Sequence, residues 1–499
     1  MLFKFCKSIL YYTKRNICSL KSDTIFALSS GHGKCGVAVI RISGSNSETA
    51  LKLMTGLSST PKPRTAILKS IRNHINGEVI DKGLVLWFPG PKSFTGEDSV
   101  EFQVHGGVAI INAVLESLRT ISNLRLAEPG EFTRRAFLNG KLDLTEVEGL
   151  ADLLQAETEA QRKQAYLQSQ GSLSKLYNKW MTTLIRNVAH VEAHIDFDET
   201  ETMDFGIIDA VKHDIQKLAK NIETHLADGR KGEILRCGVR TVILGEPNVG
   251  KSSLLNLLCH RPAAIVTPIE GTTRDILEVT LNIGGYPLVL ADTAGLRSDS
   301  IDVVEREGIS RALQLYEKSD LVILVVDSER YLRWKNDHAD KSFKDYLVDY
   351  LEKLKLSDLL KSSNTCDIRF NKKCILVFNK ADLSAEHIDI DSQTCVSISC
   401  ITEYGVPTLI KSISLHLKDL CGEPTAEHPS MNQIRHRQHL TDCLKHLRLF
   451  IESSDNHNQD LVIMAEHLRR ALKHLGKLLG KVTTEDLLDV IFKDFCIGK

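Results

Sequence analysis

The sequence predicts a multidomain protein of mixed α/β and α architecture. It combines an N-terminal α+β domain, a helical domain, and a doubly wound nucleotide-binding domain inserted into the helical one. Length is the first observation, because 499 residues correspond to about three domains at ~100–200 residues each. The second is a series of nucleotide-binding motifs between residues 245 and 400. The third is a helical pattern on both sides of that series, which favours packing of the two helical stretches against each other.

Composition is that of an ordinary globular protein and limits the classes of function. Apolar residues make up 42% and charged residues 25% of the chain, and a net charge of −1 gives no overall basic field for nucleic acid. No apolar run reaches the ~20 residues of a membrane helix. Twelve cysteines occur without a C-x-x-C pair, which argues against zinc and against secretion.

Residues 1–22 differ from the rest of the chain. They carry five Lys or Arg side chains, no Asp or Glu, and interleaved apolar and aromatic residues. A basic leader without acidic residues is typical of a mitochondrial transit peptide. A disordered basic tail is the alternative.

Residues 23–141 have the pattern of a compact α+β domain. Gly36–Ile42 and Gly83–Phe88 are apolar runs bounded by Gly and Pro, which predicts two strands. Ala109–Leu118 has the apolar spacing of a helix.

Helical spacing begins at residue 142 and continues to 236, where Thr145 and Glu148 predict a capping box at the first helix. Residues 237–420 then alternate strands with helices, with a hairpin turn expected at Gly284-Gly285, and residues 421–499 are helical again. The strands expected in the central segment are Val239–Leu244, Leu288–Ala291, Leu321–Val326, Cys374–Phe378 and Val396–Ile398.

Residues 245–252 read Gly-Glu-Pro-Asn-Val-Gly-Lys-Ser and fit the phosphate loop of nucleotide-binding proteins. In such a loop the glycines let backbone N–H groups point at the β-phosphate. Lys251 places a cation on the β- and γ-phosphates, and Ser252 offers its hydroxyl to Mg²⁺. Further along, Thr273 is expected to provide a second hydroxyl ligand, and Asp292 to hold Mg²⁺ through water.

The base is predicted by residues 379–382, which read Asn-Lys-Ala-Asp. A fixed carboxylate at Asp382 can accept two hydrogen bonds from the edge of guanine, whereas adenine lacks that pair of donors. The motifs therefore predict a GTPase.

Two positions in this domain are unusual. Leu296 stands where Ras-like enzymes carry a water-orienting Gln, so another carboxylate or amide has to orient the attacking water. Asn248 places an amide oxygen beside the β-phosphate, which suits a monovalent cation. A role in stabilising the loop is an equal alternative for Asn248.

Several blocks resemble the MnmE (TrmE) family of tRNA-modification GTPases, specifically its mitochondrial members. The resemblance covers nearly everything after the leader, although residues 30–36 depart from the family pattern. The blocks that carry it are 36–44, 86–91, 94–107, 127–144, 271–275, 304–309 and the final 495–499, Phe-Cys-Ile-Gly-Lys.

The resemblance implies K⁺-activated GTP hydrolysis by G domains that meet face to face. Asn248, Thr267, Ile269 and Thr272 would hold K⁺, while Ser252 and Thr273 would hold Mg²⁺. Glu305 would be the catalytic acid that orients the attacking water, acting with Lys251. The residues expected to contact GTP are Asn248, Val249, Gly250, Lys251, Ser252, Ser253, Thr267, Thr272, Thr273, Asp292, Thr293, Ala294, Gly295, Asn379, Lys380, Asp382, Ser399 and Cys400.

For the N-terminal domain, the resemblance implies folate binding and homodimer formation. Arg41, Glu101 and Lys141 correspond to folate-contacting residues, and Lys499 would reach the folate through its side chain or terminal carboxylate. A pterin needs a carboxylate partner and a glutamate tail needs cations, so these residue types fit. Cys496 would act as a nucleophile or proton donor, or would be a packed tail cysteine.

The resemblance further implies modification of carbon 5 of wobble uridine 34 in mitochondrial tRNAs, in the matrix. An MnmG-type partner would carry FAD and use NADH, and 5,10-methylene- or 5-formyl-tetrahydrofolate would supply the one-carbon unit. Glycine or taurine would supply the amine. A regulatory GTPase of mitochondrial ribosome assembly and a folate-binding scaffold with vestigial GTPase activity are the alternatives.

Overall fold

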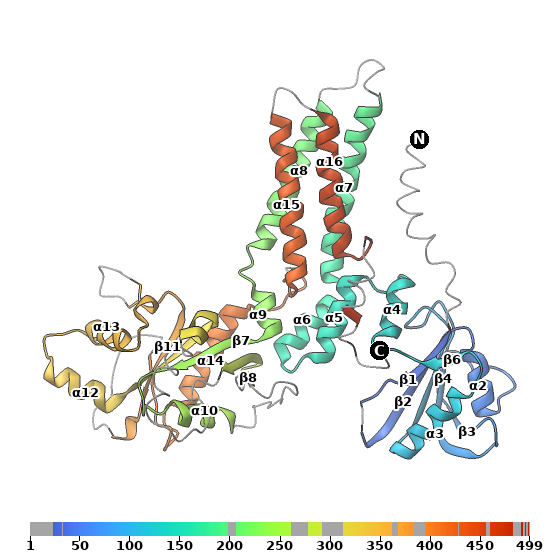
Figure 1. The fold of residues 1–499 in the computed structure, drawn as a ribbon, viewed down its shortest axis with the longest axis horizontal. Coiled ribbons are helices and arrows are strands. Elements are labelled where there is room, and N and C mark those ends of the chain that lie inside the picture. Colours follow the sequence, from blue (N-terminus) through green and yellow to red (C-terminus); the bar gives the residue numbers. More distant parts are fainter. Residues whose placement is uncertain are drawn as a thin grey trace. The chain divides into compact units, whose positions relative to one another are not determined.

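In the computed structural model (Figure 1), two compact units are present: residues 1–151, 168–220 and 439–499 form one, and residues 152–167 and 221–438 the other. None of the described helices is long and apolar enough to cross a membrane. The predicted transit peptide, 1–22, lies outside the described residues. The structure describes residues 23–31, 33–197, 206–260, 278–291, 313–361, 368–383, 395–427, 429–455, 460–482, 491, 492, 495 and 498.

The first unit contains a six-stranded sheet in the order β3-β4-β5-β2-β1-β6. Neighbouring strands are antiparallel except β1 and β6, which are parallel. Helices α2 (Ser47–Thr55) and α3 (Val108–Arg119) bury their apolar sides in one core with alternate strand residues. The α+β prediction is therefore confirmed. The strands are β1 Thr24–Leu28, β2 Cys35–Ser43, β3 Ile67–Arg72, β4 Val79–Phe88, β5 Ser99–Gly106 and β6 Leu124–Leu126.

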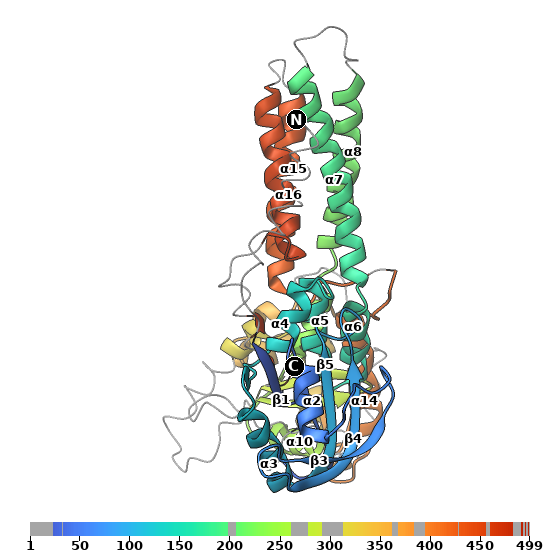
Figure 2. The same cartoon turned by 90° about the vertical axis from the view of Figure 1, so that its right-hand side faces the viewer.

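Long helices from both sides of the nucleotide-binding segment form a bundle (Figure 1, Figure 2), as the sequence predicts. Helices α7 and α16 pack closely along their length. In α7 the buried side chains Tyr177, Leu184 and Val191 recur every seven residues, so they lie on one face. The helices are α4 Glu131–Leu138, α5 Leu144–Gln155, α6 Glu159–Ser169, α7 Ser172–Phe197, α8 Gly206–Leu226, α15 Ile434–Asp455 and α16 Leu461–Leu478.

The start of α5 differs from the prediction. Asp143, not Thr145, is the N-cap, because its Oδ1 accepts hydrogen bonds from the backbone N–H groups of Thr145 (2.9 Å) and Glu146 (3.1 Å). In return the Glu146 carboxylate accepts from the N–H of Asp143 at 2.8 Å. The capping box is therefore Asp143 with Glu146, and the predicted pair of Thr145 and Glu148 was wrong.

The second unit contains a six-stranded sheet in the order β12-β11-β10-β7-β9-β8, parallel except for the β8–β9 hairpin. The hairpin turns at Gly284 (φ +62°) and Gly285 (φ +87°), as predicted. The strands are β7 Val239–Leu244, β8 Glu278–Ile283, β9 Tyr286–Ala291, β10 Leu321–Asp327, β11 Lys373–Asn379 and β12 Cys395–Ser397.

Helices cover both faces of this sheet. Along β10, Ile323 and Val325 face α10 and α14, whereas Leu324 and Val326 face α12 and α13. This alternation confirms a doubly wound domain. The helices of the unit are α9 Lys231–Cys237, α10 Lys251–Cys259, α12 Ser328–Asp337, α13 Phe343–Lys353, α14 Val406–Cys421, and the 3₁₀ turns η1 Ser357–Leu359 and η2 Ala381–Leu383.

The long connection between β10 and β11 shares a packed core with one face of the sheet. Tyr331 on α12 lies against three aromatic rings, with centroids 5.3 Å from Phe343, 5.0 Å from Tyr346 and 5.3 Å from Phe378. The connection is thus a folded part of the domain that covers one face of the sheet.

Candidate functional site

Motifs far apart in the sequence meet at one edge of the second unit's sheet. Strands β7, β9, β11 and β12 are parallel, so their carboxyl ends lie at the same edge. The phosphate loop follows β7, Asn379 ends β11, and Ser399 comes shortly after β12. Strand β9 ends at Ala291, directly before Asp292. Ligands of doubly wound sheets bind at this edge.

The backbone of the phosphate loop requires glycine at two positions. Gly245 has a φ of +155° and Gly250 a φ of +96°. A Cβ on Gly250 would overlap Nδ2 of Asn379, and one on Gly245 would overlap the carbonyl oxygen of Val325. Helix α10 begins directly after Gly250 with no side-chain cap. The N–H groups of its first turn are therefore placed to bind an anion.

Lys251 is held inside the loop. Its Nζ donates hydrogen bonds to the carbonyl oxygens of Gly245 (2.8 Å) and Glu246 (2.7 Å). Burial lowers the pKa of Lys251. Ser252 and Ser253 are exposed at the start of α10, and Asn248 is exposed with a left-handed φ of +66°. The loop thus presents a cation, two hydroxyls and an amide on one short segment.

Asn379 braces the phosphate loop against the segment after β12. Its Nδ2 donates to the carbonyl oxygen of Val249 at 2.8 Å, and its Oδ1 accepts from the N–H of Cys400 at 3.3 Å. The side chain is buried. Sequence reasoning placed Asn379 among the GTP contacts; this bridging role was not foreseen.

The other guanine-motif residues are ordered by different contacts. Lys380 has a φ of +65° and its Nζ lies 2.7 Å from Oδ2 of Asp327. Asp382 is exposed. Ser399 is buried, and its hydroxyl accepts from the N–H groups of Ile401 (3.3 Å) and Thr402 (3.2 Å). Ser399 therefore shapes the turn that carries Cys400.

Tyr350 of α13 is a site residue that sequence reasoning missed. Its hydroxyl donates to the carbonyl oxygen of Val325 at 2.7 Å and accepts from the N–H of Glu246 at 2.9 Å. Burial raises the pKa of Tyr350, so the phenol stays protonated and can do both. The Glu246 carboxylate in turn pairs with Arg330 at 2.8 Å. No motif contains Tyr350 or Arg330.

A second group of predicted residues lies on the N-terminal sheet. The β2–β5 register places Arg41 directly opposite Glu101, on the face away from α2 and α3. Nε of Arg41 donates to Oε1 of Glu101 at 3.0 Å, and the guanidinium lies 5.3 Å from the ring of Phe94 and 5.9 Å from that of Phe132. Lys141 is exposed and donates to the carbonyl oxygen of Pro91 at 3.0 Å.

The C-terminal segment lies against the same sheet. The hydroxyl of Ser29, just after β1, donates to the carbonyl oxygen of Gly498 at 2.8 Å. A Cβ on Gly498 would overlap the carbonyl oxygen of Leu28, so this approach requires glycine. The contact brings Gly498, the neighbour of Lys499 in the sequence, to the N-terminal domain.

Many of the predicted site residues lie outside the described part of the chain. They are Thr267, Ile269, Thr272, Thr273, Asp292, Thr293, Ala294, Gly295, Glu305, Cys496 and Lys499.

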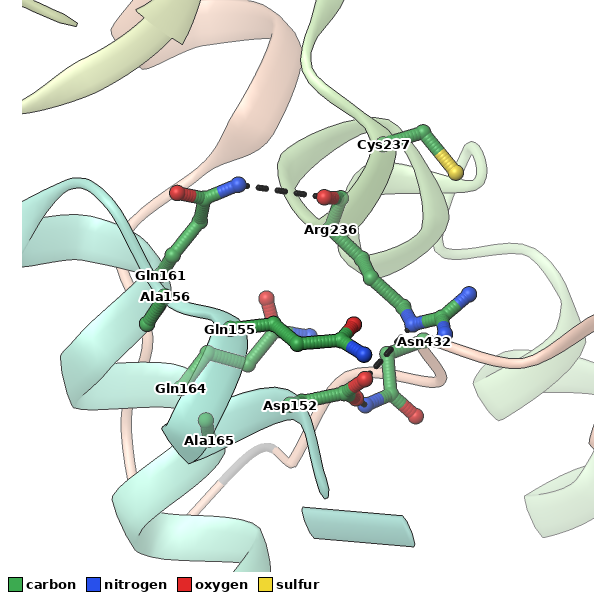
Figure 3. Close-up of a pocket in the computed structure, with 9 residues that line it drawn as sticks. All are labelled: Asp152, Gln155, Ala156, Gln161, Gln164, Ala165, Arg236, Cys237 and Asn432. Carbon is green, nitrogen blue, oxygen red and sulfur yellow. Dashed lines mark hydrogen bonds and ion pairs between the residues drawn. The ribbon is translucent and has the colours of Figure 1, made fainter. Parts of the chain in front are cut away.

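A small polar cavity of about 230 Å³ lies beside α9, between α5 and α6 (Figure 3). Asp152 accepts from Nε of Arg236 at 2.7 Å and from Nδ2 of Asn432. Among the described residues, Nε2 of Gln164 and Oδ1 of Asn432 have no hydrogen-bond partner. The cavity is smaller than the 300–1,000 Å³ typical of ligand pockets, and none of the predicted site residues lines it.

Two protein-family descriptions match this chain, one over its N-terminal domain and one over the rest. The family description "MnmE helical domain" matches residues 144–496, and "GTP-binding protein TrmE N-terminus" matches residues 24–141. The chain belongs to the MnmE (TrmE) family of tRNA-modification GTPases. Membership confirms the predicted family and the predicted enzyme class.

Full-length relatives of this family occur in animals and bacteria. The protein named 5-taurinomethyluridine-tRNA synthase subunit GTPB3, mitochondrial, from Danio rerio is 48% identical over 97% of this chain and 95% of its own length. Its namesake in Homo sapiens is 43% identical over 97% of both chains. The tRNA modification GTPase MnmE of Parvibaculum lavamentivorans is 44% identical over 96% of this chain and 100% of its own.

Proposed function

We propose that this MnmE-family GTPase, with an FAD-dependent MnmG-type partner, installs a taurinomethyl or carboxymethylaminomethyl group at C5 of wobble uridine 34 in mitochondrial tRNAs. The observation that carries the proposal is the match, over 97% of this chain, to the Danio rerio protein named 5-taurinomethyluridine-tRNA synthase subunit. That name includes "mitochondrial", and the basic leader at residues 1–22 agrees with import into the matrix.

The loop and strand ends at the edge of the second sheet support GTP binding as part of this proposal. The glycine-dependent loop and the α10 N-terminus would hold the phosphates, with Lys251 moving from the loop carbonyls to the β- and γ-phosphates. Asp382, exposed near the end of β11, would accept hydrogen bonds from guanine. Ser252 and Thr273 would hold Mg²⁺, which neutralises part of the negative charge of the phosphates when it is bound.

K⁺ activation forms part of the same proposal. Asn248 is exposed on the loop with its amide available to a cation, and Thr267, Ile269 and Thr272 would complete the ligand set. Glu305 would orient the attacking water, since Leu296 has no polar group to do so. The G domains would meet across the K⁺ ions.

Folate binding would use the sheet of the first unit. The Arg41 guanidinium pairs with Glu101 and lies near the rings of Phe94 and Phe132. A pterin could replace the guanidinium as the hydrogen-bond donor to the Glu101 carboxylate. Lys141 and Lys499 would bind the glutamate tail, and the Ser29–Gly498 contact places the terminal segment near this sheet. Cys496 would contribute a thiol to the one-carbon chemistry, and the domain would form the homodimer.

The deciding experiment is mass spectrometry of wobble nucleosides in mitochondrial tRNA from cells depleted of this protein. Wild type, Glu305→Ala and Cys496→Ser would be re-expressed in parallel. Loss of a 5-substituted uridine on depletion, restored by wild type, would support the tRNA modification. Failure of Glu305→Ala to restore it would support coupling to GTP hydrolysis, and failure of Cys496→Ser would support a role of the thiol in the chemistry. An unchanged nucleoside profile after depletion would reject the modification and favour a regulatory role in ribosome assembly.

K⁺ dependence is tested separately with purified protein. GTP turnover is expected to be faster in KCl than in NaCl for wild type, and equal in the two salts for Asn248→Ala. Equal wild-type turnover in both salts would reject K⁺ activation without affecting the tRNA assignment.

A further inference from the structure

Helices α15 and α16 carry four histidines that approach one another along the bundle. His439 and His446 are seven residues apart on α15, and His467 and His474 are seven apart on α16, so each pair lies on one face of its helix. Ring centroids are 5.6 Å apart for His439 and His474, and 5.9 Å for His446 with either His474 or His467. Figure 1 and Figure 2 show the two helices side by side.

One end of this histidine row has the dimensions of a metal site. The Nδ1 atoms of His439 and His474 are 3.5 Å apart, and Nδ1 of His474 lies 3.6 Å from Oδ2 of Asp442. One ligand atom from each of the three residues lies within 4.8 Å of the others. Four ligands about 2.0–2.1 Å from a Zn²⁺ ion are separated by roughly 3.3 Å in a tetrahedron. The separation of 3.6 Å between His474 and Asp442 is longer than the about 2.7–3.2 Å of a direct N–H···O hydrogen bond.

The positions of the three side chains on the helices suit the same interpretation. His439 and Asp442 are three residues apart on α15, and His474 comes from the facing helix α16. Metal sites in helical bundles use this combination of a histidine and a carboxylate one turn apart with ligands from facing helices. His439 and His474 are half-buried and Asp442 is exposed, so an ion can enter from solvent.

At His474 the surroundings favour the neutral imidazole, which is the ligand form of histidine. Burial lowers the pKa of His474; Lys477 and Lys473 lower it further, while Asp442 opposes them. The ring of His446 stacks beside that of His474, and its buried Nδ1 has no hydrogen-bond partner among the described residues. This stacking restricts the orientation of the His474 ring.

We propose that His439, Asp442 and His474 bind a divalent transition metal ion of the Zn²⁺ class, which joins α15 to α16. Two imidazoles and one carboxylate leave at least one coordination position open. The absence of a C-x-x-C pair argues only against thiolate zinc sites and does not bear on these ligands. The proposal is independent of the function in tRNA modification.

The test is a titration of the full, tag-free chain with Co²⁺, followed by the visible absorption of the four-coordinate ion and by competition with Zn²⁺. Wild type is expected to bind one such ion per chain. His474→Gln and Asp442→Asn are expected to weaken Co²⁺ binding at least tenfold. His467→Gln is the matched control, because it alters the same histidine row without removing one of the three ligands.

A second measurement keeps the test decisive if His474→Gln fails to fold. Asp442 is exposed, so Asp442→Asn removes a ligand without disturbing packing. Zn²⁺ is expected to raise the thermal midpoint of wild type and of His467→Gln, but not that of Asp442→Asn. Equal Co²⁺ affinities for Asp442→Asn and His467→Gln, or a wild-type spectrum without a four-coordinate ion, would overturn the proposal.

Discussion

Replacing Asn379 by alanine tests whether this buried amide holds the phosphate loop in place before any nucleotide binds. The substitution removes the donor to the Val249 carbonyl at 2.8 Å and the acceptor from the Cys400 N–H at 3.3 Å. At about 1 kcal/mol for each hydrogen bond, the loop loses about 2 kcal/mol. Since 1.4 kcal/mol is a factor of ten, local opening should become roughly 30-fold more frequent.

The assay is amide hydrogen exchange of the nucleotide-free protein, read on the peptide that contains Val249 and Gly250. Asn379→Ala is expected to lower the protection of that peptide by roughly 30-fold, because exchange reports local opening. Asp382→Ala is the control: its side chain is exposed, so it should weaken GTP binding without changing exchange in the loop. If Asn379→Ala weakens GTP binding while protection stays at the wild-type value, the bracing role is refuted.

Three further predictions concern single side chains. Tyr350→Phe should destabilise the second unit by about 1–2 kcal/mol in urea, because the Val325 carbonyl and the Glu246 N–H both lose a partner. Burial lowers the pKa of His225 to about 4, below the ordinary value of 6.5. The unfolded chain therefore binds the extra proton as pH falls from 6.5 to 4, and stability falls with it. The free energy of unfolding should differ between pH 7.5 and pH 5.0 by about 2 kcal/mol less in His225→Gln than in wild type, as measured by urea unfolding. An unchanged difference would exclude His225 as its source. Gly498→Ala should displace the terminal segment from Leu28 and speed its removal by carboxypeptidase, whereas Gly140→Ala, where the Cβ meets no other atom, should not.

Local patterns predicted the strands of the second sheet well, but of the six strands of the first sheet they predicted only β2 and β4. Sequence spacing alone was enough to predict the strand at Leu321–Val326 and the strand ends that carry the nucleotide-binding motifs. Buried parallel strands and glycine-dependent loops both have strong local sequence signals. The start of α5 shows the limit of such signals. Asp143 with Glu146 and Thr145 with Glu148 both have capping-box spacing, two residues apart. The helix starts where Leu144 and Val147 pack against Phe492, a contact that no local pattern contains.

Long-range contacts account for the parts of the site that the sequence could not predict. Tyr350 meets Glu246 across 104 residues, and its role depends on how the β10–β11 connection folds. The pairing of Arg41 with Glu101 depends on the register of β2 and β5. The family resemblance implied that both residues contact folate, but it did not imply that they contact each other. The histidine row arises from two helices whose facing sides are defined only once the bundle has formed.

The contact between Ser29 and Gly498 has a consequence for the order in which the protein matures. It joins positions 469 residues apart, so the N-terminal sheet acquires this partner only after residue 498 has been translated. At roughly 5–20 residues per second, synthesis of the intervening residues delays this contact by about 25–95 seconds. A chain shortened by a premature stop codon a few residues upstream would still contain every strand of that sheet and the whole phosphate loop. It would nevertheless lack the segment that contacts β1. Such a chain would keep nucleotide binding and lose the chemistry that the N-terminal sheet supports.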